Sequence, residues 1–108
     1  METPLPNVIA TYIAAKNAFD VNATLACFSD NAVVHDEHRD HQGQWEIKLW
    51  IEETIIKYQD QLRPIRWAAK DRTVALTAEI SGTFDGSPIE LDIHFTIEQD
   101  KITDLSVQ

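Results

Sequence analysis

The sequence predicts an α+β fold in which three N-terminal helices pack on one face of a curved, mostly antiparallel sheet. Two patterns carry this prediction. Up to about residue 59, apolar residues recur mainly with the three- and four-residue spacing of helices, interrupted by one short strand. From Arg63 onward, apolar and polar residues alternate, and short turn sequences separate the alternating runs. Helices followed by consecutive hairpin strands are typical of α+β domains.

The first helix is predicted to begin within residues 4–7, with Thr3 or Asn7 as its cap, and to end near Ala18. Proline is tolerated in a first helical turn because its missing N–H would be unpaired there. Apolar residues at positions 8, 9, 12 and 13 share one face of this helix. Tyr12 lies in the middle of that face, either as a core residue whose hydroxyl meets a backbone carbonyl or as a functional group.

Asp20 is predicted to cap a short second helix, which Ser29–Asn31 would end. A strand is expected over Ala32–His38, where side chains alternate between the two faces. One face of this strand holds Ala32, Val34, Asp36 and His38, and the outer face holds Val33, His35 and Glu37.

The longest helix is predicted over Gln44–Gln59, after a loop spanning Arg39–Gly43. Apolar residues at positions 47, 50, 51, 54, 55 and 58 form the stripe expected of a helix that lies on a sheet. Trp50 belongs to this main stripe and is placed to form a pocket wall. A second, offset stripe predicts a further neighbour for this helix; it consists of Trp45, Leu49 and Ile56.

Four strands are predicted within residues 63–70, 74–84, 89–98 and 102–107. The turns between them are expected at Asp71-Arg72, at the strong hairpin signal Asp85-Gly86, and at Gln99-Asp100-Lys101. The outward face of these strands is rich in Thr, Ser, Glu and His, which suits a solvated face or a wet dimer interface. A homodimer through this outer face is therefore expected.

Composition limits the classes of protein and of partner. The 108 residues are enough for one domain, residues 1–108, with one core. Nine basic against eighteen acidic residues give a net charge of −9, which argues against nucleic acid and anionic membranes as partners. The lone Cys27 suits a small core residue, and the N-terminal METPLPN resembles no secretory signal. A cytoplasmic protein is expected.

Four segments, in this order and spacing, resemble the cone-shaped, cystatin-like fold of the nuclear transport factor 2-like superfamily, and within it the SnoaL-like and ketosteroid isomerase-like branch. The resemblance covers essentially the whole chain. The segments are VIATYIAAKNAFD at 8–20, LACFSDNAVVHDEH at 25–38, HQGQWEIKLWI at 41–51 and DIHFTIEQDKITDL at 92–105.

The resemblance implies roles for two residues. The oxyanion-donating tyrosine of the ketosteroid isomerase family matches Tyr12, and its proton-shuttling strand aspartate matches Asp36. In that family the second oxyanion donor is an aspartic acid that stays protonated because its apolar site raises the pKa of the carboxyl group. Its position is taken here by Ile93, while the adjacent Asp92 should face the opposite side of the strand. The oxyanion hole would therefore be half built.

The predicted site joins Asp36 as general base, Tyr12 as oxyanion donor and His38 as a second donor or base. Burial should raise the pKa of Asp36 toward the range useful for a base. The expected chemistry is proton abstraction next to a carbonyl in a small apolar molecule, leading to isomerisation, dehydration or aldol-type cyclisation, as in SnoaL-like cyclases. The predicted ligand-binding residues are Phe28, Val34, Trp50, Thr54, Ile93 and Phe95.

Two other functions remain open from the sequence. One is a non-catalytic module that binds an apolar ligand, because fold does not fix function. The other is a structural dimerisation domain. His35, Asp36, His38 and His41 could ligate a metal on composition alone, but His35 and His38 fall on opposite strand faces and His41 on an exposed loop. We therefore expect neither a metal nor a cofactor.

Overall fold

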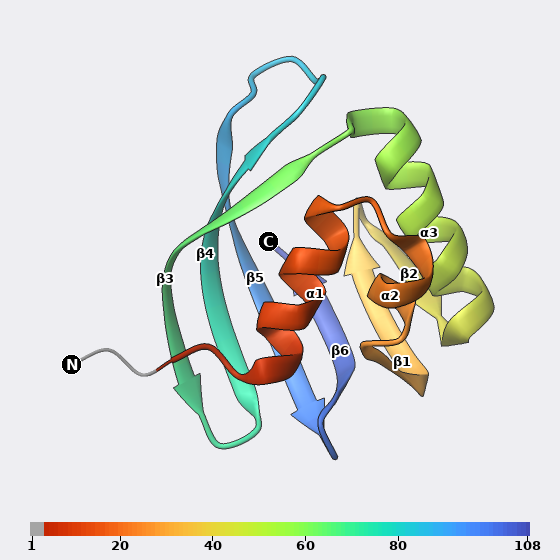
Figure 1. The fold of residues 1–108 in the computed structure, drawn as a ribbon, viewed down its shortest axis with the longest axis vertical. Coiled ribbons are helices and arrows are strands. Elements are labelled where there is room, and N and C mark those ends of the chain that lie inside the picture. Colours follow the sequence, from red (N-terminus) through yellow and green to blue (C-terminus); the bar gives the residue numbers. More distant parts are fainter. Residues whose placement is uncertain (1–3) are drawn as a thin grey trace.

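Three helices lie on one side of a six-stranded sheet in the computed structural model, which describes residues 4–108 (Figure 1). The α+β prediction is confirmed, with one correction: two strands, not one, precede the third helix in the sequence. The elements are α1 (Asn7–Asn17), α2 (Val21–Leu25), β1 (Phe28–Asp36), β2 (Arg39–Gln42), α3 (Gly43–Tyr58), β3 (Gln61–Lys70), β4 (Thr73–Ser81), β5 (Ile89–Glu98) and β6 (Lys101–Val107).

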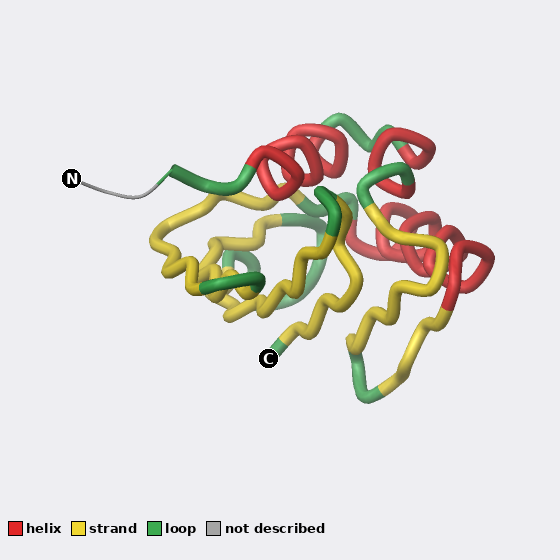
Figure 2. The backbone as a smooth tube through the Cα atoms, turned by 90° about the horizontal axis from the view of Figure 1, so that it is seen from below, coloured by secondary structure: helices red, strands yellow, loops and turns green. Residues whose placement is uncertain are grey.

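The strand order is β2-β1-β6-β5-β4-β3, and the sheet curves strongly when it is seen from its end (Figure 2). Neighbouring strands are antiparallel except for β1 and β6, which pair in parallel. The last strand of the chain therefore lies between β1 and the β3–β5 meander. This arrangement places the end of β1, with Asp36, on the same side of the sheet as the helices.

The helix ends follow the local signals in the sequence. Helix α1 begins at Asn7 with no side-chain cap, and the alternative cap Thr3 lies outside the described residues. The Asp20 side chain accepts a hydrogen bond from the Ala23 N–H at 3.0 Å, so its predicted cap of α2 is confirmed. Gly43 adopts a φ of +83° at the start of α3, a conformation that favours glycine.

The predicted course of the chain around β1 is wrong at both ends. The strand begins at Phe28, so Ser29–Asn31 continue it rather than form a break. It ends at Asp36, and the expected loop is a hairpin: Glu37 and His38, with φ values of +54° and +61°, form the turn into β2. A two-residue turn of this kind requires positive φ at both residues. Glycine or asparagine usually marks such a turn in a sequence, and neither is present at these two positions.

The connection between β4 and β5 also departs from the prediction. Residues 82–88 are irregular, so β4 stops at Ser81 instead of continuing to Phe84, and Asp85-Gly86 is not a tight hairpin. At this point Gly82 lies against the end of α3: a Cβ at this position would lie 2.4 Å from the Tyr58 carbonyl oxygen. The turns at residues 71–72 and 99–100 are found as predicted.

The core lies between the helices and the inward-facing side chains of the sheet, as the main apolar stripes predict. Buried Ile47, Trp50 and Ile51 bring α3 onto it. The offset stripe of α3 does not gain the expected neighbour among residues 4–108, because Trp45 and Ile56 are 71% and 80% exposed. No helix in this part of the chain is long and apolar enough to cross a membrane.

Candidate functional site

A cavity of about 460 Å³ opens between the helices and the sheet. Its walls come from α1, α3, the end of β1, the start of β3, the β4–β5 region and β6. Most of the wall surface is apolar, from aliphatic and aromatic side chains, and polar side chains interrupt it at a few points. Six of the nine predicted site residues line it: Tyr12, Asp36, His38, Trp50, Thr54 and Ile93.

The other three predicted residues stand behind the cavity wall rather than in it. Phe28, Val34 and Phe95 are buried in the core. The Tyr12 ring packs edge-on against Phe28 and Phe95, with ring centroids 5.7 and 5.8 Å away. Edge-to-face packing fixes ring orientation, so the two phenylalanines hold Tyr12 in place instead of contacting a ligand as predicted.

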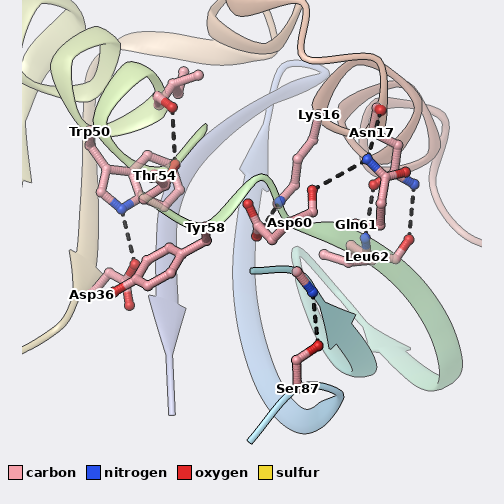
Figure 3. Close-up of polar contacts among 12 residues, drawn as sticks. Lys16, Asn17, Asp36, Trp50, Thr54, Tyr58, Asp60, Gln61, Leu62 and Ser87 are labelled. Carbon is pink, nitrogen blue, oxygen red and sulfur yellow. Dashed lines mark hydrogen bonds and ion pairs between the residues drawn. The ribbon is translucent and has the colours of Figure 1, made fainter. Parts of the chain in front are cut away.

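Asp36 is the last residue of β1, where its half-buried carboxylate reaches the cavity. The Trp50 indole Nε1–H, from the middle of α3, donates a hydrogen bond to Asp36 Oδ2 at 3.0 Å (Figure 3). Burial raises the pKa of Asp36, and the Trp50 hydrogen bond opposes part of this rise. The result is an oriented carboxylate that binds a proton more readily than an ordinary aspartate.

Tyr12 presents its phenol to the same cavity from the buried face of α1. Burial raises the pKa of Tyr12 well above its ordinary value, and the nearby charges of Asp60 and Asp36 add to the rise. The phenol is therefore neutral across the physiological range and can donate a hydrogen bond. Tyr12 and Asp36 thus supply a proton donor and a proton acceptor to one cavity.

A third polar point in the cavity, Lys16 with Asp60, was missed by the sequence analysis. Lys16 Nζ donates to Asp60 Oδ2 at 2.6 Å, and both side chains are mostly buried (Figure 3). Asp60 Oδ1 has no hydrogen-bond partner within residues 4–108. The position of Lys16 could have been predicted from the sequence, because it lies one helical turn from Tyr12 on α1. The position of Asp60 could not, because it follows Gln59, a left-handed residue outside any regular element.

The cavity mouth is built from the β1–β2 turn and the end of α3. The Glu37 carboxylate accepts hydrogen bonds from the Tyr58 hydroxyl and from Lys57 Nζ, the latter at 3.3 Å. The Tyr58 hydrogen bond is the main reason that the pKa of Glu37 is lowered. Glu37 therefore lines the cavity instead of the outer sheet face, and His38 is exposed at the rim rather than held on a strand.

The remaining histidines of this region are arranged differently from the prediction. His41 is on β2, not in an exposed loop, and its buried ring lies 6.1 Å from the Trp50 ring. His35 is on the outer face, as expected, between Asp40 at 2.7 Å and Asp104 at 3.2 Å. Within residues 4–108, no group of three or more His, Cys, Asp or Glu side chains is arranged to hold a metal ion.

Comparison with known proteins assigns the family. The SnoaL-like domain model matches residues 9–105. The chain belongs to the SnoaL-like domain family. No curated protein matches this SnoaL-like chain.

Solved structures share the fold of this SnoaL-like chain closely. A candidate polyketide cyclase from Sinorhizobium meliloti is 31% identical, with a TM-score of 0.93 over 96% of this chain and 95% of that one. SalBIII, an epoxide hydrolase/cyclase-like enzyme of pyran ring formation in salinomycin, is 20% identical (TM-score 0.82; 93% and 85% covered). A protein with a ketosteroid isomerase-like fold from Catenulispora acidiphila is 16% identical (TM-score 0.85; 97% and 86% covered). The last two likenesses concern the fold.

The second oxyanion acid of ketosteroid isomerases has no counterpart on β5 of this SnoaL-like chain. Ile93 faces the cavity and pairs with Leu76 on β4. Asp92 points to the outer face, where its carboxylate accepts a hydrogen bond from the Thr77 hydroxyl at 2.8 Å. The irregularity in β5 pairing falls between Thr96 and Ile97, too far along to turn Asp92 inward. The expected gap at Ile93 is therefore present in the structure.

Proposed function

We propose that this chain is a SnoaL-like enzyme that abstracts a proton next to a carbonyl of a small apolar molecule. The observation that carries the proposal is that Asp36, with its raised pKa, and Tyr12, a neutral donor, line one cavity. A general base is most useful when its pKa lies near the working pH, and an oxyanion donor must keep its proton. The two side chains meet these opposite requirements.

The step begins with the Asp36 carboxylate taking the proton from the carbon next to the carbonyl. The electron pair of the C–H bond forms a carbon–carbon double bond, and the carbonyl π electrons move onto oxygen. Tyr12 donates a hydrogen bond to this developing oxyanion. When a second double bond is conjugated with the enolate, protonated Asp36 returns the proton at the far carbon of this dienolate, giving isomerisation. In the alternative outcomes the proton on Asp36 goes to a β-hydroxyl group that the enolate expels as water, giving dehydration, or to the oxygen of a second carbonyl that the enolate attacks, giving cyclisation.

The remaining lining residues would hold and orient the substrate. Trp50 fixes the Asp36 carboxylate through its 3.0 Å hydrogen bond and offers an indole wall. Ile93 and the aliphatic residues of α3 and β4 would cover an apolar skeleton. His38, at the rim, would contact the end of a ligand nearest to solvent. A cavity of about 460 Å³ falls in the size range of small-molecule sites.

The proposal is tested with a panel of enolisable ketones in D₂O, in which loss of the α-proton signal is followed by NMR. Wild-type protein should accelerate deuterium exchange for at least one ketone, and Asp36→Asn should abolish the acceleration. Asp92→Asn is the matched control, because Asp92 lies on the outer face. Equal exchange rates for wild type and Asp36→Asn would refute the role of Asp36.

A non-catalytic binding module is the second candidate, and one observation favours it. The Trp50–Asp36 hydrogen bond leaves the carboxylate satisfied without a substrate, as a structural pair would be. A ketone that quenches Trp50 fluorescence on binding, yet undergoes no exchange across the panel, would support this reading.

The homodimer through the outer sheet face also stays a prediction, which sedimentation velocity would test.

A further inference from the structure

We propose that Lys16 is the second oxyanion donor of the cavity, held in position by Asp60. This inference rests on the proposed function and supplies the group that is missing at Ile93. The side chain enters from α1 instead of β5, so it does not correspond to the acid that the sheet lacks. The proposal stands on the position of Lys16, on the pairing of Asp60, and on the bonds that already join the same segments.

Position is the first argument. Lys16 follows Tyr12 by four residues on α1, and side chains at this spacing lie next to each other on one helix face. Both line the cavity. An ammonium group has three protons, and one of those of Lys16 is directed to Asp60 Oδ2 at 2.6 Å. We infer that an oxygen bound to the Tyr12 hydroxyl would be within reach of the buried Lys16 ammonium, which has further protons to donate.

The state of Asp60 is the second argument. Its residue surface is 8% exposed, and Oδ1 has no partner among the described residues. A buried ion pair adds little stability unless further hydrogen bonds satisfy its remaining atoms, and a buried atom without a partner calls for an explanation, of which a catalytic role is one. Asp60 Oδ2 accepts a hydrogen bond from Lys16, but Asp60 Oδ1 accepts none from the described residues. A contribution to stability alone therefore explains the pair poorly.

The structural alternative is a clamp between α1 and the start of β3, and that clamp already exists without the pair. Asn17 Nδ2 donates to the Leu62 carbonyl at 2.9 Å, and the Leu62 N–H donates to Asn17 Oδ1 at 2.8 Å. The Gln61 side chain donates to the Asn17 carbonyl at 3.0 Å (Figure 3). These bonds join the same two segments independently of Lys16 and Asp60.

The assignment changes the electrostatics of the proposed step. Asp60 neutralises Lys16 when the cavity holds a neutral carbonyl compound, so the Lys16–Asp60 pair adds no net charge to the cavity. When negative charge develops on the carbonyl oxygen, the ammonium can share it with the Tyr12 phenol. Hydrogen bonds from ionised donors are about twice as strong as neutral ones. Lys16 is then a catalytic residue, and Asp60 is a positioning residue that acts through it.

The test uses 4-nitrophenol, whose ionised and neutral forms absorb differently and which mimics an enolate and its enol. The measured quantity is the ratio of the dissociation constants of the two forms. Lys16→Met should reduce the preference for the ionised form by about 10- to 100-fold, the usual worth of a hydrogen bond to a charged group. Asp60→Asn should increase that preference, because it leaves the cation uncompensated.

Three further variants keep the test decisive. Lys16→Met/Asp60→Asn leaves no buried charge behind if the single Lys16 variant fails to fold, and it should also lose the preference. Asn17→Ala is the matched control: it should lower stability through the α1–β3 contact and leave the preference unchanged. Asp36→Asn should raise the preference for the ionised form, because it removes a negative charge from the same cavity, while losing ketone exchange.

The outcomes separate this inference from the proposed function. Three results would overturn the role of Lys16. The first is an unchanged preference in the Lys16 variants, and the second is an equal loss of preference in Lys16→Met and Asp60→Asn. The third is that the ionised probe does not bind to wild type. The role of Asp36 would still stand if Asp36→Asn abolished exchange. Conversely, full exchange in Asp36→Asn with a lost preference in Lys16→Met would retain the anion site and reject the base.

Discussion

Replacing Tyr12 with phenylalanine removes one hydrogen-bond donor from the cavity with little other change. The ring is held edge-on by Phe28 and Phe95, at centroid distances of 5.7 and 5.8 Å, and phenylalanine can keep both contacts. The residue is 3% exposed, so removal of its hydroxyl also removes the cost of burying a polar group. We expect the free energy of unfolding to change by less than about 1 kcal/mol.

Catalysis should respond far more strongly than stability. An oxyanion-hole donor contributes on the order of 10²–10³ in rate, or about 3–4 kcal/mol. If Tyr12 shares the oxyanion with a second donor, Tyr12→Phe should retain some activity above background. Because burial and the nearby carboxylates raise the pKa of Tyr12, the wild-type rate should show no loss from phenol ionisation within the physiological range.

The assay combines deuterium exchange into a ketone substrate, measured against pH, with urea denaturation of the same samples. A fall in rate of about 10²-fold or more, with stability nearly unchanged, is the expected result. A rate within twofold of wild type would refute the assignment of Tyr12 as donor. A large loss of stability would instead show that the hydroxyl is a structural group.

Three other predictions follow from the site and its surroundings. Trp50→Phe removes the hydrogen bond that lowers the pKa of Asp36, so the acid limb of the pH–rate profile should move to higher pH; a limb that stays in place would exclude Trp50 as the partner that tunes the base. Asp36→Asn should be more stable than wild type at neutral pH. The raised pKa of Asp36 means that the folded state binds this proton more readily, so its stability falls as pH rises through that pKa. Urea denaturation should therefore show a gain for Asp36→Asn that grows as the pH rises above about 4, the ordinary pKa of an aspartate, and a gain independent of pH would contradict the sign. Gly82→Ala should lower the free energy of unfolding by about 1–3 kcal/mol, because its Cβ would lie 2.4 Å from the Tyr58 carbonyl oxygen; unchanged stability would mean that the 82–88 segment shifts freely.

Periodicity predicted the residues on regular elements well. Tyr12 on the inner face of α1, Asp36 at the inward end of β1 and Trp50 on the main stripe of α3 all reach the cavity. Each sits where several turns or alternations of apolar residues fix the direction of the side chain. The absence of an acid at position 93 could be predicted for the same reason, since strand alternation places Ile93 and Asp92 on opposite faces of β5.

The missed or misplaced residues lie where periodicity carries no information. Glu37 and His38 leave the strand in a turn of two non-glycine residues with positive φ, so alternation assigned them to the wrong positions. Asp60 reaches Lys16 across 44 positions of sequence, a contact that only the tertiary structure creates. Trp45 was expected to pack on a neighbour but is 71% exposed, because a stripe of apolar residues does not show whether anything covers it.

The most direct test of the central claim is a crystal structure of Asp36→Asn with a bound ketone that the wild type enolises. The measured quantities are the distance from the carbonyl oxygen to the Tyr12 hydroxyl and the placement of the α-carbon. We expect a hydrogen-bond distance of about 2.5–3.0 Å at Tyr12, with the α-carbon facing residue 36. A ketone whose carbonyl oxygen lies at the Glu37–Tyr58 rim, away from Tyr12, would contradict the account.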